Sequence, residues 1–285
     1  MKIAILGKGG SGKSTISWLL SSYLSTNLSQ PVLAIDADHN MDLSANLGFE
    51  VTPSTKTILE CNNNLRQILS LKENDKWFNV FSNSNLPTFS FPNLDSFSQD
   101  ISYQLNSNLY LQILGLGQES LLYQDMCSHA HSAGLKFYLA LLKFQPNSNL
   151  IIDGVAGTDM LNYGLYLGCN ASIVSLENHI NSQRVLDKIL VINKSVGLPT
   201  YVVLNKYQDN QSYSKLKEKY EEYIIGKINL DNAIVDNNYA SLSSQNIENL
   251  AEIVEKLSTF DELKNQNNWE RLKTFQTKKL SLEKD

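Results

Sequence analysis

The chain has 285 residues, 42% of them hydrophobic, and a formal net charge of −5. This length can bury one large α/β core or two small ones, and the acidic balance argues against a general nucleic-acid-binding surface. No apolar run approaches the ~20 residues that span a bilayer, and the apolar run 3–6 is too short for a signal peptide. Cys61, Cys127 and Cys169 are too few for a disulfide framework. We therefore expect a soluble protein of a reduced, cytoplasmic compartment.

The most informative stretch is 7–15, which reads Gly-Lys-Gly-Gly-Ser-Gly-Lys-Ser-Thr. It follows a short apolar strand at 3–6 and precedes 16–20, whose apolar spacing suits the start of a helix. It matches the pattern G-x-x-x-x-G-K-[ST], in which glycines let backbone N–H groups approach phosphates at a helix N-terminus. Lys13 is predicted to reach the β- and γ-phosphates, and Ser14 to ligate Mg²⁺. The predicted nucleotide-binding residues of this loop are Gly9, Gly10, Ser11, Gly12, Lys13, Ser14 and Thr15.

A second lysine in the same loop, Lys8, makes the motif more specific. With it, the stretch 7–15 resembles the deviant Walker A motif of the MinD, ParA, nitrogenase iron protein and ArsA ATPases. This resemblance implies an ATPase that forms a homodimer around ATP, in which Lys8 crosses to the nucleotide of the partner subunit. The alternative is a solvated loop lysine.

Carboxylates follow the second predicted strand, 31–36. Asp36, Asp38 and Asp42 lie where that strand ends, and ligand crevices lie at the carboxyl ends of strands in parallel α/β sheets. This segment resembles switch I of the same ATPases, which implies that Asp38 orients or activates the attacking water and Asp36 supports Mg²⁺. Asp42 is a weaker candidate for sensing the nucleotide. The alternative is an Asx-rich turn that caps a helix at 42–47.

The periodicity weakens between about 49 and 108. A helix is predicted within 58–71, and the phenylalanines of this segment are expected to pack an irregular excursion onto the main sheet. A loop of this length is more often functional or partner-facing than idle. The third strand is predicted at 109–114.

One thiol and two imidazoles lie within five residues, at Cys127, His129 and His131. These side chains suit Ni²⁺ or Zn²⁺, and on a helix Cys127 and His131 share a face. One chain supplies two or three ligands, so a closed site requires more donors. The alternative is a buried cysteine beside two surface histidines. The helix predicted next carries Leu135, Leu139, Leu142 and Lys143.

The same segment resembles the Cys-x-Cys region of the CooC-type ATPases that mature carbon monoxide dehydrogenase. Cys127 occupies the second cysteine position, and His129 or His131 resembles a trailing histidine of some relatives. Asp125 stands where the first cysteine would be, which removes half of the thiolate set. The resemblance implies a transition-metal site for Ni²⁺ or Zn²⁺ that two copies of the chain complete at a dimer interface.

The fourth predicted strand, 150–153, ends in Asp153, which is expected to hold Mg²⁺ through water. The following residues resemble switch II of the same ATPases, and this implies that the Gly157 amide bonds the γ-phosphate; a glycine suits a backbone that must approach a phosphate. Asn205, at the tip of the sixth strand, resembles the adenine-reading residue of that family. The remaining strands are predicted at 171–176, 200–204 and 223–228.

A helix at 235–257 is predicted to complete the domain, which we place at 1–263, with a polar tail at 264–285. Trp269, Leu272 and Phe275 have near-helical spacing in this tail. The alternatives are a MinD-like membrane helix and a docked or frayed tail, which the short apolar face favours.

Seven strands alternating with helices predict a single-domain α/β fold, a doubly wound, mostly parallel seven-stranded sheet of the P-loop NTPase type. The function expected is a Mg²⁺- and ATP-dependent, dimerising ATPase that acts as a metallochaperone or maturation factor for a nickel or iron–sulfur client enzyme. The main alternative is a MinD/ParA-type positioning ATPase on membrane or DNA, against which the acidic charge and the weak tail count. An electron carrier like the nitrogenase iron protein would need two cysteines per subunit, and Cys127 has no suitable second.

Overall fold

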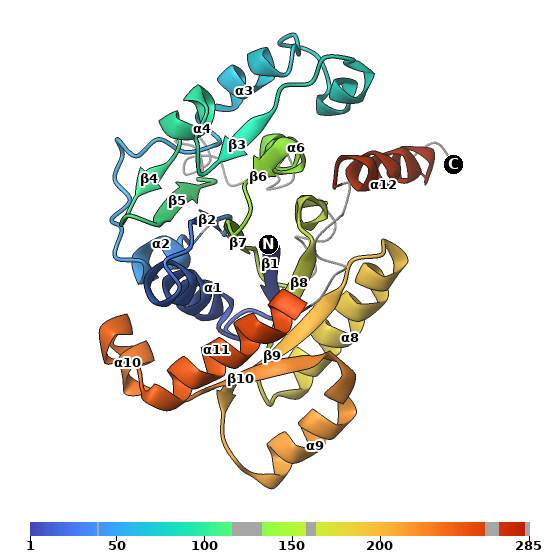
Figure 1. Ribbon diagram of the computed structural model, residues 1–285. Helices are drawn as coiled ribbons and strands as arrows, with labels where there is room; N and C mark the ends of the chain where they lie inside the picture. The colour runs from blue at the N-terminus through green and yellow to red at the C-terminus, as the bar shows by residue number, and fades with distance from the viewer. Residues whose placement is uncertain (39, 116–132, 158–163, 260–267, 283–285) are drawn as a thin grey trace.

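A computed structural model describes residues 1–38, 40–115, 133–157, 164–259 and 268–282. Its centre is an eight-stranded sheet in the order β10-β9-β8-β1-β7-β2-β5-β4 (Figure 1). All seven predicted strands are present and parallel. The strand number is corrected to eight by β4 (Tyr103–Gln104), which pairs antiparallel with β5 at the edge. The parallel strands are β1 (Lys2–Gly7), β2 (Val32–Asp36), β5 (Leu109–Ile113), β7 (Asn149–Asp153), β8 (Ala171–Leu176), β9 (Thr200–Tyr207) and β10 (Ile224–Asn229).

The central strands are apolar because both faces of the sheet are covered. Every residue of β2, β7 and β8 is buried, so these strands are mostly apolar and lack the regular polar alternation of a half-exposed strand. Successive side chains of a strand point to opposite faces. In β1, Ile3 and Ile5 join the core on one face, and Ala4 and Leu6 join the core on the other.

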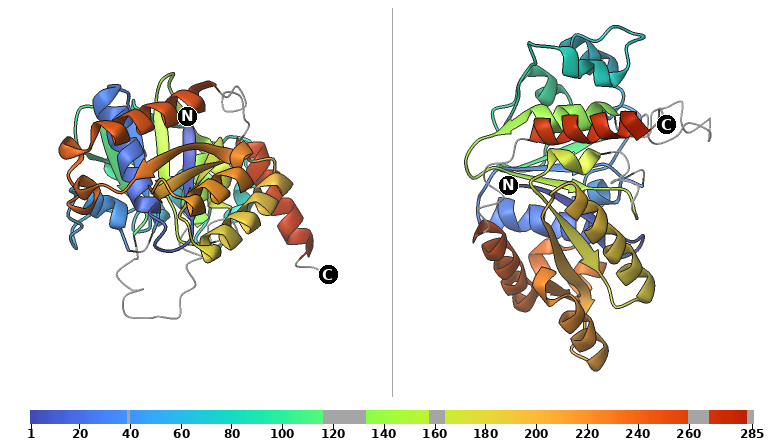
Figure 2. Two further views of the ribbon diagram at one scale, coloured as in Figure 1. Left: turned by 90° about the horizontal axis from the view of Figure 1, so that it is seen from below. Right: turned by 90° about the vertical axis from the view of Figure 1, so that its right-hand side faces the viewer.

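Helices form a layer on each face of the sheet (Figure 2). The layer that packs on Ile3 and Ile5 consists of α1 (Lys13–Ser22) with its π-helical extension Tyr23–Asn27, α2 (Asp42–Asn46), α10 (Asn232–Val235) and α11 (Ser244–Thr259). The opposite layer consists of α3 (Asn62–Ile68), α4 (Ser96–Asp100), α6 (Ala133–Leu141), α8 (Ile180–Ser195), α9 (Gln211–Lys219) and α12 (Asn268–Leu282). Short 3₁₀ turns occupy Trp77–Ser82, Leu165–Gly168, Glu221–Tyr223 and Tyr239–Ser241.

The excursion 49–108 is more ordered than its sequence indicates. Besides α3, α4 and β4 it contains β3 (Phe89–Phe91), which pairs in parallel with β6 (Leu142–Phe144). The helix predicted to carry Leu142 and Lys143 therefore ends at Leu141, and this prediction is corrected because β3 offers those residues a strand partner. The ring centroids of Phe89 and of Tyr138 in α6 lie 4.9 Å apart, so aromatic contacts join the excursion to the main domain.

The C-terminal helices also differ from the prediction. The prediction of a single helix at 235–257 is wrong, because α10 ends at Val235 and α11 begins at Ser244. Asp231 precedes α10 and ties the start of that helix to the start of α11, because its carboxylate oxygens accept hydrogen bonds from the Ala233 amide at 3.0 Å and the Ser243 amide at 3.0 Å. The chain therefore turns back between the two helices.

The tail helix α12 packs on the domain beside α6 (Figure 2). Leu272 is 1% exposed, and the Trp269 ring lies 5.0 Å from that of Phe81. Asn268 Nδ2 donates to the Gly168 carbonyl at 2.9 Å, and Arg271 donates to the Cys169 carbonyl at 2.8 Å. The apolar face of the tail thus covers the protein core. Among the described residues, no helix combines the length and hydropathy needed to cross a membrane.

Candidate functional site

The loop between β1 and α1 is shaped by left-handed glycines. Gly10 has φ 79° and Gly12 has φ 88°, values that glycine adopts without the steric cost that a Cβ imposes. A Cβ on Gly12 would also lie 2.0 Å from Asn205 Nδ2. The chain therefore turns tightly into α1, whose first N–H groups lack helical acceptors and form an anion site.

The Ser11 carbonyl anchors this loop to the neighbouring strands. It accepts hydrogen bonds from Ser175 Oγ at 2.6 Å, at the end of β8, and from Asn205 Nδ2 at 2.8 Å, in β9. In a trans peptide the N–H points opposite to the C=O, so the Gly12 N–H is directed away from those strands. Asn205 is 3% exposed and holds the loop here, while its predicted contact with adenine stays a prediction.

A lysine on β9 bonds the carbonyl of the preceding loop residue, Gly10. Lys206 Nζ donates to the Gly10 carbonyl at 3.1 Å and pairs with Glu177 Oε2 at 3.1 Å. Ser175, Glu177 and Lys206 were not predicted as site residues. The one signal in the sequence is that each lies at or just after the end of a strand. The order of the strands in the sheet, which the sequence does not give, decides that they reach the loop.

Two acids lie beside each other beneath the loop. Asp36 and Asp153 are register partners at the ends of β2 and β7, and both are 0% exposed. The amide and hydroxyl of Ser44 donate to Asp36 Oδ2 at 2.8 and 2.7 Å, and Ser17 Oγ donates to Asp153 Oδ1 at 3.2 Å. The other oxygen of each carboxylate has no hydrogen-bond partner among the described residues.

Burial raises the pKa of both acids. The pKa of Asp36 rises to about 6 because of desolvation, which the hydrogen bonds from Ser44 oppose. The pKa of Asp153 rises to about 7, mainly by desolvation, while Ser14 and Lys13 lower it. The predicted Mg²⁺ ligands Ser14, Asp36 and Asp153 thus lie together with the buried Lys13. Unpartnered carboxylate oxygens beside a hydroxyl are the hard donors that Mg²⁺ prefers, so these residues fit that ion.

We predict that, without metal and nucleotide, the free energy of unfolding falls as pH rises from about 4 to about 7. An unfolded aspartate loses its proton near 3.8, whereas folded Asp153 keeps it to about 7. The folded state therefore binds more protons in this window and loses stability as pH increases. Asp153→Asn should remove on the order of 3 kcal/mol of this decline. Urea unfolding at pH 5 and pH 8 measures it, with Glu50→Gln as the control; an unchanged decline in Asp153→Asn would contradict the assignment.

The two switch residues occupy the same edge of the sheet. Asp38 is partly exposed; its Oδ1 accepts the Asn40 amide at 3.2 Å, and its charge raises the pKa of Asp153. Gly157 has φ 81°, and its amide donates to the Gly7 carbonyl at 2.9 Å. That amide would have to leave Gly7 to bond a γ-phosphate. Lys8 donates to the Gly9 carbonyl at 3.4 Å, so its predicted reach to a partner subunit also stays a prediction.

The predicted transition-metal ligands Cys127, His129 and His131, together with Asp125, lie outside the described residues. Within the described ranges, no group of three or more His, Cys, Asp or Glu side chains forms a metal cluster. The structure therefore brings together the residues that the sequence predicts for the nucleotide loop and for Mg²⁺, and the transition-metal site stays a prediction.

Comparison with known proteins agrees with this geometry. Residues 2–241 match the model of the CobQ/CobB/MinD/ParA nucleotide-binding domain. The chain belongs to this family of nucleotide-binding domains. It is 26% identical over 241 residues to an uncharacterized ATP-binding protein of Methanocaldococcus jannaschii, covering 84% of this chain and 88% of that protein.

Several solved structures share this fold. A plasmid partition protein of Borrelia burgdorferi bound to AMPPNP has a TM-score of 0.60 and 20% identity, over 91% of this chain and 98% of that one. MinD of Pyrococcus horikoshii with Mg-ADP has a TM-score of 0.59 and 18% identity, over 90% and 96%. A variant of Cyanothece McdA in complex with ATP has a TM-score of 0.61 and 20% identity, over 91% and 97%. At these identities the likeness concerns the fold.

Proposed function

We propose that this family member hydrolyses ATP slowly, in a Mg²⁺-dependent reaction that acts as a switch. The observation that carries the proposal is the pair of buried carboxylates, Asp36 and Asp153, each with one oxygen that has no hydrogen-bond partner among the described residues; the charge of Lys13 acts on the second of them. Phosphate release from ATP, measured with Mg²⁺ and with excess EDTA, tests it. Release that is absent with Mg²⁺, or unchanged by EDTA, would overturn it.

Each residue of the site has a defined task in this proposal. Loop amides and Lys13 bind the β- and γ-phosphates, and Asp38 orients the attacking water and accepts its proton. Ser14, Asp36 and Asp153 would hold Mg²⁺, and the bound ion would neutralise charge on the phosphates. Lys13, Asp36 and Asp153 are buried, and electrostatic contacts are stronger where water is excluded.

The proposal includes a homodimer that ATP closes and hydrolysis reopens. Lys8 is placed at the exposed side of the loop, with its ammonium bonded only weakly at 3.4 Å to Gly9, so a partner's phosphates offer it a stronger, charge-assisted contact.

We predict that Lys8→Ala reduces ATP-driven dimerisation by about tenfold, the order expected for one lost contact to a charged group. Sedimentation with a non-hydrolysable ATP analogue and with ADP measures the dimer fraction, with Lys188→Ala on the outer helix α8 as the control. Equal dimerisation of wild type and Lys8→Ala, or a monomeric wild type, would count against a role for Lys8 across the dimer.

We further propose a cargo for the switch: a transition metal delivered to a nickel or iron–sulfur client enzyme. The support is the donor set of Cys127, His129 and His131, with Asp125, which is suited to Ni²⁺ or Zn²⁺ and which two chains together would complete to four ligands.

We predict that Cys127→Ser weakens Ni²⁺ or Zn²⁺ binding by at least about tenfold, because the thiolate is the softest donor of the set. Titration of each metal in the presence of the ATP analogue measures affinity and stoichiometry, expected at one metal per two chains. Cys61→Ser is the control. Identical affinity in wild type and Cys127→Ser would remove the cargo and leave the ATPase.

A second candidate function is a positioning ATPase, favoured by the partition protein, MinD and McdA among the structural neighbours. The packing of α12 on the core and the net charge of −5 weigh against a membrane tail or a basic DNA-binding surface. Co-sedimentation with anionic vesicles or with DNA, with ATP present, distinguishes the two; binding to either would favour this candidate over the metal carrier.

A further inference from the structure

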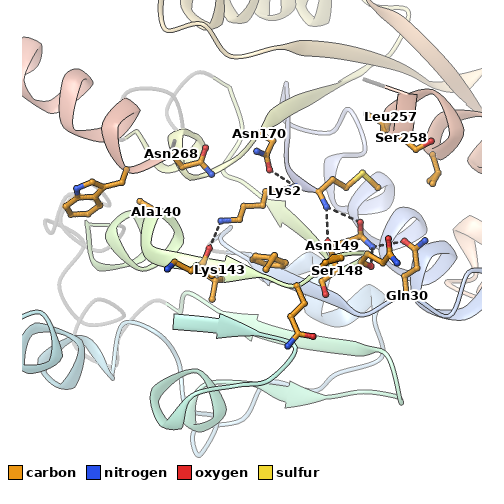
Figure 3. Close-up of a pocket in the computed structure, with 18 residues that line it drawn as sticks. Lys2, Gln30, Ala140, Lys143, Ser148, Asn149, Asn170, Leu257, Ser258 and Asn268 are labelled. Atoms are coloured by element: carbon orange, nitrogen blue, oxygen red, sulfur yellow. Dashed lines mark hydrogen bonds between the residues drawn. The ribbon is translucent and has the colours of Figure 1, made fainter. Parts of the chain in front are cut away.

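A cavity lies at the end of the sheet where β1 and β7 begin (Figure 3). The loop follows the last residue of β1, whereas the cavity surrounds Lys2 at its start and Asn149 at the start of β7. The final turn of α11 and the first turn of α12 close its sides. Its volume is about 740 Å³, within the range of small-molecule sites.

The ammonium group of Lys2 brings a positive charge to this cavity without a paired carboxylate among the described residues. Lys2 Nζ donates to the Leu142 carbonyl at 2.5 Å and lies 5.1 Å from the centre of the Phe144 ring. No carboxylate pairs with it in the described part of the chain, and the residues that line the cavity include neither aspartate nor glutamate. Burial lowers the pKa of Lys2 to about 8, which reflects the cost of holding a cation away from water and from an anion.

Hydrogen-bonding groups on the walls are also unsatisfied. Ser148 Oγ and Asn268 Oδ1 are buried and, within the described residues, have no hydrogen-bond partner. Ser148 is 2% exposed and Asn268 is 6% exposed. Buried polar atoms in proteins are nearly always paired, so these two atoms leave unused hydrogen-bonding capacity in residues that line the cavity. Asn268 Oδ1 can only accept, so a partner for it must carry a donor.

We propose that this cavity binds a small organic acid that also carries hydroxyl or amino groups. Its carboxylate pairs with the ammonium of Lys2, which has donors left after bonding Leu142. Its hydroxyl or amino donors reach Asn268 Oδ1 or Ser148 Oγ, and the amides of Gln30 and Asn170 line the same space (Figure 3). The site is separate from the nucleotide loop and does not depend on the proposed ATPase cycle.

Isothermal titration of the full chain with citrate, L-glutamate and inorganic phosphate tests the proposal. We expect citrate or L-glutamate to bind more tightly than phosphate, which fits the cation but not the wall acceptors. Lys2→Met should weaken that binding by about tenfold or more, Lys2→Arg should retain most of it, and Lys188→Met should leave it unchanged. Failure of both organic acids to bind, or equal affinity in Lys2→Met, would overturn the proposal.

Amine labelling of the unmodified protein gives a readout that requires no variant. Acylation of Lys2 and of Lys188, followed by mass spectrometry, should show that the bound acid slows the labelling of Lys2 alone. Equal protection of both lysines, or none of Lys2 at saturating acid, would place the ligand elsewhere and contradict the site. Since Lys2 remains in place, a failure to fold cannot produce either result.

Discussion

Lys13→Ala is expected to lower the affinity for ATP by about 100-fold, the upper range for one contact to a charged group. Lys13 is 6% exposed at the start of α1, beneath the loop, and its charge acts on Asp153. Its ammonium is therefore already desolvated and placed for phosphate, so its loss removes binding energy that water cannot replace. Equilibrium binding of a fluorescent ATP analogue measures the effect.

The Lys13→Ala result requires two controls. Lys188→Ala, on an exposed position of α8, should bind ATP like wild type. Far-UV circular dichroism and a urea titration show whether Lys13→Ala is folded, because loss of a buried cation also changes the charge balance around Asp153. A folded Lys13→Ala protein with wild-type affinity would exclude this loop as the phosphate site.

Asp38→Ala is expected to keep ATP affinity within about threefold and to lose about 100-fold or more in turnover, the range for removing a general base. Asp38 follows the buried strand β2 but is itself partly exposed, and its charge is felt by Asp153. We therefore expect it to act on the attacking water and not on the phosphates, so its removal should affect the transition state more than the ground state.

Single-turnover phosphate release and equilibrium binding, measured in parallel, separate these effects for Asp38→Ala. Glu50→Ala, an exposed acid beyond α2, is the control and should change neither quantity. Equal losses in affinity and turnover would make Asp38 a binding residue, and wild-type turnover would remove it from the mechanism.

The nucleotide loop and the acid pair could be predicted from sequence because each depends on a short, continuous segment. The pattern 7–14 contains its own strand end, glycines and helix start. Asp36 and Asp153 each follow an apolar run, and in a parallel sheet the ends of such runs meet at one edge. The sequence alone did not show that these two acids are direct neighbours, which depends on β7 lying between β1 and β2.

Residues that support the site from a distance could not be predicted in this way. Ser175 and Lys206 reach the loop only because β8 and β9 follow β1 in the sheet, and no local pattern encodes that order. Ser44, in the short helix α2, donates a hydrogen bond to Asp36. The sequence pattern drew attention instead to Asp42, in the first turn of the same helix.

The errors in helix boundaries have a similar origin. The helical sequence pattern continues through Leu142 and Lys143, past the end of α6. The helix ends earlier because these residues belong to β6, which pairs with β3, more than fifty residues earlier in the chain. Between α10 and α11 the chain turns back, and the Asp231 carboxylate bonds the Ser243 amide twelve residues later. Tertiary contacts decided both boundaries over local propensity.

We propose above that Asp36 and Asp153 form the Mg²⁺ site of an ATP-hydrolysing switch, and the Mg²⁺ dependence of ATP hydrolysis is the decisive measurement for this assignment. Hydrolysis should be measured across a Mg²⁺ titration in wild type, Asp153→Asn and the exposed-acid control Glu50→Gln. Asp153→Asn is expected to need at least about tenfold more Mg²⁺ for half-maximal rate, while Glu50→Gln should match wild type. A Mg²⁺ requirement identical in Asp153→Asn and wild type would contradict it.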